Sequence, residues 1–406
     1  MTDTPTLFFV NRYFHPDLSA TSQLLGDLVF DLARGGYRVE VITGRQDYGD
    51  PSRVLAPFET IGGAAVRRVA TTRFGRANLA GRAVDYLTFY LAAGASLIRR
   101  LRAGDLVVAE TDPPLISVVA ALAARIRGAA LVNWIQDLFP EVATALGVRA
   151  VAPLAPLLRA LRNRSLRIAK RNVVLGDRMA ARLRALGIPG ETIAVIPNWA
   201  DEGALAPVPR EANPLRAQWG LDGAFVIGYS GNMGRAHEFE TIIGAAEILK
   251  HEPAIRFLFI GAGAGLAYLE REAARRGLAN VAFKPYQPRE ALSRSLSAAD
   301  VHLISLKPAL EGLIVPSKFY GVAAVGRPTL YIGDPGGEIP AILARAQCGF
   351  TVAPGDAAGL AGRIRDLAAD SHAAAALGAR ARMLAETEFA KARALEEWRK
   401  VIDATL

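Results

Sequence analysis

The sequence predicts an α/β protein built from two doubly wound parallel-sheet domains. Three observations point to this fold: the chain has 406 residues, strand-like apolar runs alternate with helical segments in both halves, and a proline-rich stretch separates the halves. That stretch extends from Pro197 to Pro214 and is predicted to be a linker. We expect a first domain over residues 1–200, a second over 201–385, and a C-terminal helix over 386–406 that packs back on the first.

The first half begins with a buried strand and a polar loop. A helix over residues 23–34 follows, with an apolar stripe and a Gly35-Gly36 stop. The strands predicted for this half are 6–10, 38–43, 65–69, 105–110, 130–135, 172–175 and 192–196. Asp137 and Glu141 follow the strand 130–135, so they are expected at its carboxyl end.

The second half repeats this alternation. Its predicted strands are 224–230, 255–260, 281–283, 300–306, 328–332 and 349–352, each followed by a loop or helix. Parallel sheets bind ligands outside the carboxyl ends of their strands. We therefore expect the ligand in a central cleft that the carboxyl ends of both sheets face.

One segment of the second half combines the features of an anion site. Between two predicted strands, Ser317 can cap a short helix that begins near Lys318 and ends at Gly326. The free backbone N–H groups of that helix and the Lys318 ammonium would then face one phosphate. The alternative is an ordinary crossover in which Ser317 only begins a helix.

A second loop, from Gly231 to Arg235, offers further backbone donors and a cation. The spacing of Gly261, Gly263 and Gly265 does not match the dinucleotide fingerprint, and the sequence contains no Walker A, nucleophile-elbow or His-Glu-x-x-His motif. Five scattered histidines and no Asp-x-Asp pair predict no metal site. The remaining donors suit a diphosphate held without a metal.

Positive charge is concentrated in the first half. Residues 1–200 hold 25 Lys and Arg against 16 Asp and Glu, whereas residues 201–406 hold 23 of each. Two basic amphipathic segments, from Arg73 to Arg102 and from Arg149 to Arg184, favour an anionic membrane surface. The alternative is a pair of core helices with solvated Arg faces. No nucleic-acid-binding motif accompanies the charge, so no nucleic acid partner is expected.

Other features place the protein in the cytoplasm. The single Cys348 excludes a disulfide within the chain and a cysteine-based zinc site. The N-terminus lacks the basic region of a signal peptide, and the uncharged apolar runs are too short to span a bilayer. We expect a cytoplasmic protein that is peripheral on the inner membrane.

Seven segments in order resemble glycosyltransferase family 4, especially its bacterial O-antigen and exopolysaccharide branch, including fucosamine and colanic-acid type enzymes. They are NRYFHPDLSAT, WIQDLFPE, VIPNWAD, YSGNMGRAHEFETI, FIGAGAG, the loop and helix over 284–300, and EGLIVPSKFYGVAAVGRPTLYIGD. The resemblance covers nearly the whole chain. It implies the two-domain GT-B fold, with Rossmann-like domains.

The resemblance also implies an activity: retaining, metal-independent transfer of a sugar from a UDP- or GDP-sugar to a polyprenyl-diphosphate-linked saccharide. No cofactor beyond the nucleotide sugar is expected. Arg235 and Lys318 would neutralise the diphosphate, Glu311 would bind donor hydroxyls, and Asp137 would approach the sugar or acceptor. The donor would further contact Gly231, Asn232, Gly234, Tyr286, Ser317 and Glu338, and the acceptor side would include Arg12, Ser19, Thr21 and Glu141.

The sequence departs from the family pattern at two places. The second acid of the family's E-x7-E motif falls on Gly321. The ribose contact of that acid must then come from another residue, for which Glu338 is the candidate, or be absent. The usual Lys-Gly after the first strand of the second domain is His237-Glu238 here. We expect His237 to be a structural or a loop residue, which leaves the phosphate contact to Arg235 and Lys318.

Several roles have structural alternatives. Asp137 could cap a helix, Arg235 and Glu311 could be solvated loop residues, and Tyr286 could pack for structure alone. Two other functions also fit the fold. A nucleotide-sugar 2-epimerase would turn over the donor without an acceptor, and a non-catalytic scaffold of a polysaccharide assembly complex would bind no nucleotide sugar.

Overall fold

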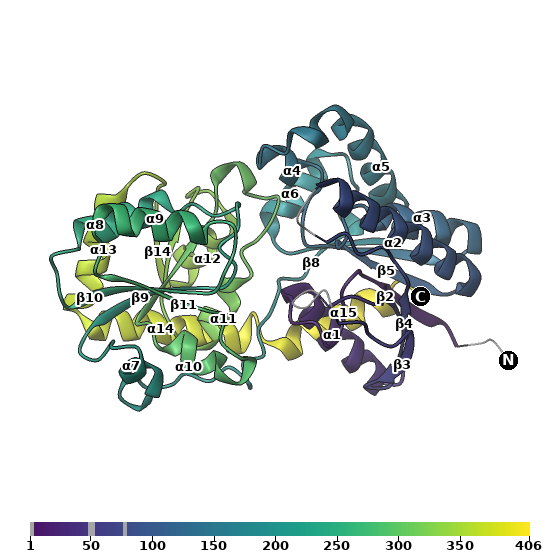
Figure 1. The fold of residues 1–406 in the computed structure, drawn as a ribbon. Helices are drawn as coiled ribbons and strands as arrows, with labels where there is room; N and C mark the ends of the chain where they lie inside the picture. The colour runs from purple at the N-terminus through teal and green to yellow at the C-terminus, as the bar shows by residue number, and fades with distance from the viewer. Residues whose placement is uncertain (1–3, 48–52, 76–78) are drawn as a thin grey trace. The chain divides into compact units, whose positions relative to one another are not determined.

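The computed structural model describes residues 4–47, 53–75 and 79–406. Residues 76–78, which belong to the basic segment predicted from Arg73 to Arg102, lie outside this range, as do residues 1–3 of the predicted strand-forming N-terminus. Contacts within the chain divide it into two compact units, Met1–Pro197 with Leu395–Leu406, and Asn198–Ala394. Each unit contains one sheet with helices on both faces (Figure 1), as the alternation of strands and helices predicts.

The first unit is organised around an eight-stranded sheet in the order β3-β4-β2-β1-β5-β6-β7-β8. Every neighbouring pair is parallel except β3 with β4. The strands are β1 (Thr6–Val10), β2 (Arg38–Gly44), β3 (Phe58–Ile61), β4 (Ala64–Val69), β5 (Leu106–Glu110), β6 (Ala130–Ile135), β7 (Arg171–Val174) and β8 (Ile193–Val195). Seven of these were predicted. The eighth, β3, is an edge strand with no buried residue, so it lacks the apolar run that identifies the others.

Helices cover both faces of this sheet. They are α1 (Ala20–Arg34), α2 (Leu79–Arg100), α3 (Ile116–Arg127), α4 (Glu141–Ala145), α5 (Ala155–Ile168) and α6 (Asp177–Ala185), with short 3-10 turns at Arg149–Leu154 and Gly190–Thr192. The last part of α15 (Lys391–Asp403) also belongs to this unit. There Trp398 packs against Trp134 of β6, with ring centroids 4.7 Å apart.

The two basic helices do not match the core-helix alternative. In α2, Phe89 and Leu97 are fully buried against the sheet, whereas Leu87 and Leu91 are 56% and 66% exposed. In α5 the apolar stripe itself faces solvent, and Leu157 is 59% exposed. Neither helix is therefore a simple core helix with a solvated Arg face.

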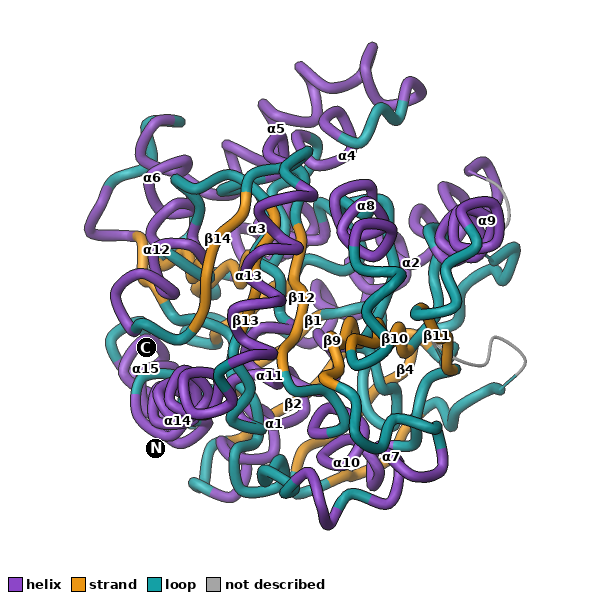
Figure 2. Tube along the Cα trace, turned by 90° about the vertical axis from the view of Figure 1, so that its left-hand side faces the viewer, coloured by secondary structure: helices purple, strands orange, loops and turns teal. Residues whose placement is uncertain are grey.

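The second unit contains a six-stranded sheet in the order β11-β10-β9-β12-β13-β14, and all its pairs are parallel. Figure 2 shows these strands side by side in this spatial order. The strands are β9 (Phe225–Ser230), β10 (Ile255–Ile260), β11 (Val281–Lys284), β12 (Val301–Ser305), β13 (Thr329–Ile332) and β14 (Gly349–Val352). The helices are α7 (Pro214–Gln218), α8 (Glu240–Ile248), α9 (Leu266–Arg276), α10 (Leu292–Ser297), α11 (Lys318–Ala324), α12 (Glu338–Ala346), α13 (Ala357–Ala369), α14 (Ser371–Thr387) and the start of α15.

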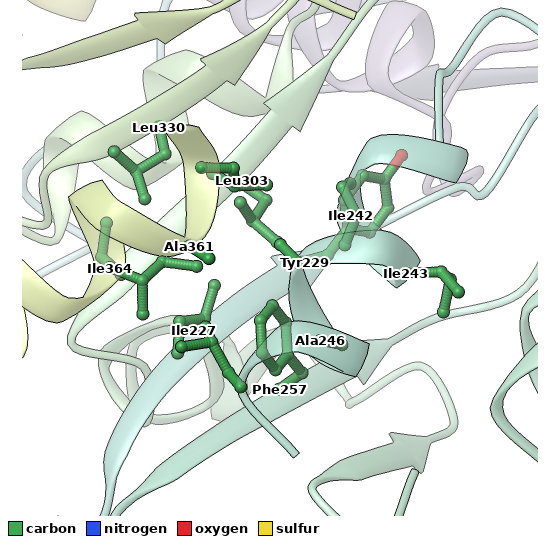
Figure 3. Packing of buried hydrophobic residues seen from close by; sticks show 14 of the residues in the cluster. Ile227, Tyr229, Ile242, Ile243, Ala246, Phe257, Leu303, Leu330, Ala361 and Ile364 are labelled. Atoms are coloured by element: carbon green, nitrogen blue, oxygen red, sulfur yellow. The ribbon is translucent and has the colours of Figure 1, made fainter. Parts of the chain in front are cut away.

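A continuous apolar core fixes this sheet against the helices on one face. Ile227 and Phe257 from neighbouring strands are fully buried with Ile242 of α8 and Ile364 of α13 (Figure 3). The strands are almost entirely apolar because both sheet faces are covered. This packing gives the loops at the strand ends a rigid base.

Both sheets contain a point where the chain reverses its direction of progress. In the second sheet β9 lies between β10 and β12, and in the first sheet β1 lies between β2 and β5. Loops that leave such neighbouring strands diverge and open a crevice at their carboxyl ends. The two candidate sites lie at these two positions.

Candidate functional site

In the second unit, the loop after β9 is tied to the end of β12. The His237 ring nitrogen Nδ1 lies 2.6 Å from the carbonyl oxygen of Ser305, and the Glu238 backbone N–H donates to the Ser305 hydroxyl at 3.2 Å. The Lys307 backbone N–H donates to the carbonyl of Ala236 at 2.9 Å. The loop is thus fixed at the point where the strand order reverses.

Lys318, the first residue of α11, points into this loop. Its Nζ lies 3.0 Å from His237 Nε2 and 5.4 Å from the centroid of the Tyr229 ring. Because the Ser305 carbonyl can only accept, His237 Nδ1 carries the proton, and Nε2 accepts from the Lys318 ammonium. No carboxylate in the described part of the chain forms an ion pair with Lys318.

The protonation states follow from this arrangement. Burial, and after it the Lys318 charge, lower the pKa of His237 to about 3. Burial also lowers the pKa of Lys318 to about 8. Near pH 7 the lysine is therefore mostly charged, while its partner is a neutral imidazole. A desolvated cation that lacks a counter-ion within the described residues favours binding of an anion.

Glycines bring the neighbouring backbone close to this cation. Gly231 has φ +119°, and a Cβ there would lie 2.9 Å from Lys318 Cε. Gly261, after β10, has φ +134°, and a Cβ would come within 2.2 Å of the Gly231 carbonyl oxygen. The predicted donor residues Asn232, Gly234 and Arg235 belong to the same loop. Arg235 is exposed, and no ion pair occupies it within the described residues.

Glu311 and Glu338, two predicted donor contacts, lie together. Glu311 Oε1 accepts from the backbone N–H of Glu338 at 2.8 Å, at the start of α12. Glu311 Oε2 accepts from the Tyr331 hydroxyl at 3.2 Å. Burial raises the pKa of Tyr331 most, and the negative charge of Glu311 raises it further. Glu311 thus stabilises the first turn of α12, a role its sequence position did not reveal.

Ser317 and Tyr286 show two further differences in detail. Ser317 occupies the position before α11, but its side chain makes no capping hydrogen bond, so the predicted cap is wrong. Its backbone is helical, and this conformation differs from the extended one that capping residues adopt. The Tyr286 side chain is 56% exposed in the loop after β11.

The first unit has a pocket of about 470 Å³ at its own reversal point. It collects side chains from the loops that follow β1, β2, β5 and β6 and from α2. Its lining residues are Arg12, Tyr13, Thr21, Gln46, Asp47, Gly75, Arg82, Tyr86, Thr111, Asp112, Pro114, Gln136 and Asp137. The sequence-predicted residues Arg12, Thr21 and Asp137 therefore lie in one pocket.

Arg12 is a fixed part of the pocket wall. Its guanidinium carbon lies 5.3 Å and 5.1 Å from the ring centroids of Tyr13 and Tyr86. Its Nη2 lies 3.5 Å from a buried oxygen of Asp85 and 3.2 Å from Gln46 Oε1. Planar guanidinium groups stack well on aromatic faces, so these contacts hold Arg12 in one orientation.

Acidic residues gather at this pocket, among them Asp112, Asp137 and the neighbouring Glu110. The Asp137 side chain is exposed at the pocket. Desolvation by the surrounding protein and the Asp112 charge raise the pKa of Asp137 to about 6. Glu110, at the end of β5, is 1% exposed. Burial and the charges of Asp112 and Asp137 raise the pKa of Glu110 well above its usual range.

Two predicted acceptor residues are not among the pocket lining. Ser19 precedes α1, and its hydroxyl donates to Ser22 at 2.8 Å. Glu141 begins α4 and forms ion pairs with Arg162 at 2.7 Å and Arg159 at 3.5 Å. Both serve local structure here, so their acceptor roles remain predictions.

Sequence reasoning missed other members of the two sites. His237 was expected to be a structural or a loop residue, yet it holds Lys318. Tyr86 and Arg82 belong to the pocket through α2, and Gln46 through the end of β2. One signal was available for His237, because it stands where the family pattern has a phosphate-binding pair.

Two searches of the described residues gave no candidates. No group of three or more His, Cys, Asp or Glu side chains there could hold a metal ion. Across the same residues, every helix is too short or too polar to cross a bilayer.

Comparisons with known proteins identify the family. Residues 21–199 match the model of the glycosyl transferase 4-like domain, and residues 212–383 match glycosyl transferases group 1. The glycosyltransferase WbjE of Pseudomonas aeruginosa is 32% identical over 272 residues, covering 67% of this chain and 68% of WbjE. WcaI of Escherichia coli (strain K12) is 28% identical over 324 residues, covering 77% of this chain and 79% of WcaI.

Solved structures share the fold. HepE of Anabaena in complex with UDP-glucose has a TM-score of 0.73 at 17% identity, covering 98% of this chain and 99% of HepE. Sucrose-phosphate synthase of Thermosynechococcus elongatus has a TM-score of 0.78 at 18% identity, covering 98% of this chain and 100% of the synthase. The chain belongs to the group 1 glycosyltransferases of family 4 and is an enzyme with the GT-B fold.

Proposed function

We propose that this glycosyltransferase moves a sugar, with retention and without a metal, from a UDP- or GDP-sugar to a lipid-linked saccharide of a cell-surface polysaccharide. The observation that carries the donor part is Lys318, a desolvated cation with a neutral histidine as its hydrogen-bond partner. Retention and metal independence rest on the family resemblance alone.

The donor diphosphate supplies the anion that this site favours. In the proposed complex, Lys318 and Arg235 contact the diphosphate, and the glycine loop from Gly231 to Gly234 offers backbone N–H groups. When the bond to the sugar breaks, negative charge develops on the departing diphosphate oxygen. A fixed ammonium group stabilises that charge without reorganising. The same oxygen can take the proton of the acceptor hydroxyl on that face of the sugar.

The pocket of the first unit supports the acceptor part. Tyr13 and Tyr86 provide aromatic surfaces of the kind that sugar rings contact, and Asp137 and Gln136 provide hydrogen-bonding groups for hydroxyls. Arg82 lies at the start of α2 in the same wall and offers a cation to the acceptor's phosphate. We assign this pocket to the acceptor saccharide.

A lipid-linked acceptor requires access to a membrane, and one face of the first unit has suitable chemistry. Helices α2, α3 and α5 pack side by side over the sheet (Figure 1). We give the name apolar-basic face to exposed side chains of these helices and of the 3-10 turn before α5: Leu87, Leu91, Leu122, Ile126, Leu154, Leu157, Leu161 and Ile168, with Arg125, Arg164 and Arg167. Apolar side chains beside arginines suit the interface of an anionic bilayer. This supports a peripheral position on the inner membrane.

The names of relatives agree with this assignment. WcaI is named for colanic acid biosynthesis, and HepE was solved with UDP-glucose. These facts belong to those proteins. They motivate testing UDP first and a surface polysaccharide precursor as acceptor.

Calorimetric binding of UDP and GDP tests the donor site. We expect one diphosphate to bind, and Lys318→Ala to weaken it by about tenfold to a hundredfold, since a charge-assisted hydrogen bond is worth roughly 1.5–3 kcal/mol. The matched control is Lys250→Ala, an exposed lysine after α8, which should leave affinity unchanged. Wild-type affinity in Lys318→Ala would contradict the donor assignment. Turnover of a nucleotide sugar without an acceptor would favour the epimerase.

Vesicle sedimentation tests the apolar-basic face. We expect binding to vesicles that contain anionic lipid, and little binding to zwitterionic ones. Replacing Leu87, Leu91 and Leu157 with Gln should abolish it. The control replaces Ile248 and Met383, which are exposed apolar residues of the second unit. Equal loss in both variants would contradict the assignment of this face.

A further inference from the structure

A small cavity in the first unit lies behind Asp137. Its volume is about 40 Å³, and its polar lining consists of Glu110, Thr111, Ser117, Asn133, Asp137 and Arg162. Thr111 and Asp137 also line the larger acceptor pocket. The small polar cavity and the proposed substrate space therefore share Thr111 and Asp137 as lining residues.

Glu110 differs from the other buried acids of this unit. Neither of its carboxyl oxygens has a hydrogen-bond partner within the described residues. Glu40, by contrast, is ion-paired with Arg67 at 2.8 Å and with Arg100. Asp105 accepts the backbone N–H groups of Thr6 and Arg102, both at 2.8 Å. Glu110 is thus a buried carboxyl without the contacts that stabilise a negative charge.

The groups around Glu110 favour its neutral form. Asp112 and Asp137 place negative charge beside it, and both oppose its ionisation. Arg162 of α5 is the cation in the lining, and its charge is balanced by Glu141, whose Oε1 lies 2.7 Å from Nη2. Desolvation of an unpaired carboxylate is costly, so a proton on Glu110 is the lower-energy solution.

The cavity can connect Glu110 to Asp137. One water molecule requires about 10–15 Å³ and two to four polar partners. Asn133 Oδ1 and Arg162 Nη1 are buried without a partner in the described structure, as are both Glu110 oxygens. The cavity therefore has the space and the hydrogen-bonding groups for water molecules that bridge Glu110 and Asp137.

We propose that Glu110 is a positioning residue: it keeps a proton and donates a hydrogen bond, through this cavity, that holds Asp137 as an oriented carboxylate for an acceptor hydroxyl. The role for Asp137 rests on the proposed function. The protonated state of Glu110 does not, so the two parts can be tested separately.

The first test measures stability and needs no substrate. The unfolded chain releases the Glu110 proton near pH 4.3, whereas the folded protein retains it to higher pH. Between the pKa of Glu110 in the unfolded chain and its higher pKa in the folded protein, the wild type loses stability as pH rises. Its unfolding equilibrium constant increases by up to tenfold per pH unit in this range. Glu110→Gln cannot ionise, so its stability relative to wild type should increase from pH 5 to pH 8. A difference that does not change with pH would overturn the proposal.

A control and a kinetic test complete the design. Glu40→Gln removes one partner of two ion pairs, so it should unfold more readily than wild type at pH 7. In the transfer assay, Glu110→Met lacks the donor and should raise the acceptor KM at least tenfold while the donor KM stays constant. Glu110→Gln, which retains a donor, should rescue most of this loss. Equal KM values in wild type and Glu110→Met would overturn the role toward Asp137, and the stability result would then stand alone.

Discussion

The two units have the same topological feature but opposite local chemistry. In the second unit, the reversal point carries a lysine, a neutral histidine and glycine backbone. In the first unit, the same position carries Asp112, Asp137 and buried Glu110, beside a guanidinium fixed between two rings. The comparison teaches that the sheet supplies the location, while the residues after each strand decide whether an anion or a hydroxyl-bearing ligand is favoured.

The largest expected effect tests the acidic side. Asp137→Asn keeps the size of the side chain but removes its charge. We expect kcat/KM for the acceptor to fall by about tenfold to a hundredfold, because the variant loses a charge-assisted hydrogen bond to the acceptor hydroxyl that is worth roughly 1.5–3 kcal/mol. The measurement is a transfer assay with varied acceptor. Full activity in Asp137→Asn would remove the carboxylate from the account.

The pH dependence of nucleotide binding tests the basic side. Lys318 has a pKa of about 8 in the free protein, and a bound diphosphate favours its charged form. Affinity should therefore be highest below pH 8 and fall about tenfold per pH unit above it, because the lysine must first regain a proton. Calorimetry near pH 8 in buffers of different ionisation enthalpy should detect proton uptake. Affinity that stays constant from pH 7 to pH 9.5 would contradict this.

His237→Phe probes the orientation of the lysine. The variant removes the acceptor at Nε2, so Lys318 loses its hydrogen bond. We expect UDP or GDP affinity to fall about fivefold, as for a neutral hydrogen bond of roughly 1 kcal/mol. The pKa of His237 is about 3, so the residue stays neutral between pH 5 and pH 7. The loss of nucleotide affinity in His237→Phe should therefore be the same across this range. Tighter binding in this variant would show that the imidazole competes with the ligand.

A pair of glycine substitutions tests the backbone geometry through stability rather than binding. Gly231→Ala should lower the unfolding free energy by about 1–3 kcal/mol, because its φ is +119° and the new Cβ meets Lys318. Gly321→Ala should raise it by about 0.5–1 kcal/mol, since Gly321 lies inside α11 and its Cβ would meet Leu296 at 3.6 Å. Denaturant unfolding measures both. Similar changes in the two variants would contradict the argument from backbone geometry.

The fold was largely predictable, because the spacing of apolar and polar residues along the chain determines where strands and helices form. Buried parallel strands read as apolar runs, and most of them were followed by a helix with recognisable ends. The edge strand β3 was missed, since half-exposed residues in a short hairpin carry no such run. The exposure of the apolar stripe of α5 could not be predicted from the sequence either. Amphipathic spacing identifies an apolar face, but it does not say whether that face packs on the protein or faces solvent.

The site was predictable where one local segment contains the signal. Lys318 follows from a strand, a loop and a helix start in sequence. Its contact with His237, 81 residues earlier, depends on how β9 and β12 pair. Glu110 appeared to be the last residue of a strand, and only the cavity distinguishes it from an ordinary core position. Long-range placement of this kind has no local pattern.

Nucleotide binding to Lys318→Ala and Asp137→Asn, measured side by side, tests the central claim most directly. The account predicts that Lys318→Ala loses about tenfold to a hundredfold in affinity for UDP or GDP. It predicts that Asp137→Asn binds the same nucleotide as tightly as wild type. Equal loss in both variants, or loss in Asp137→Asn alone, would contradict the division of anion and hydroxyl recognition between the two units.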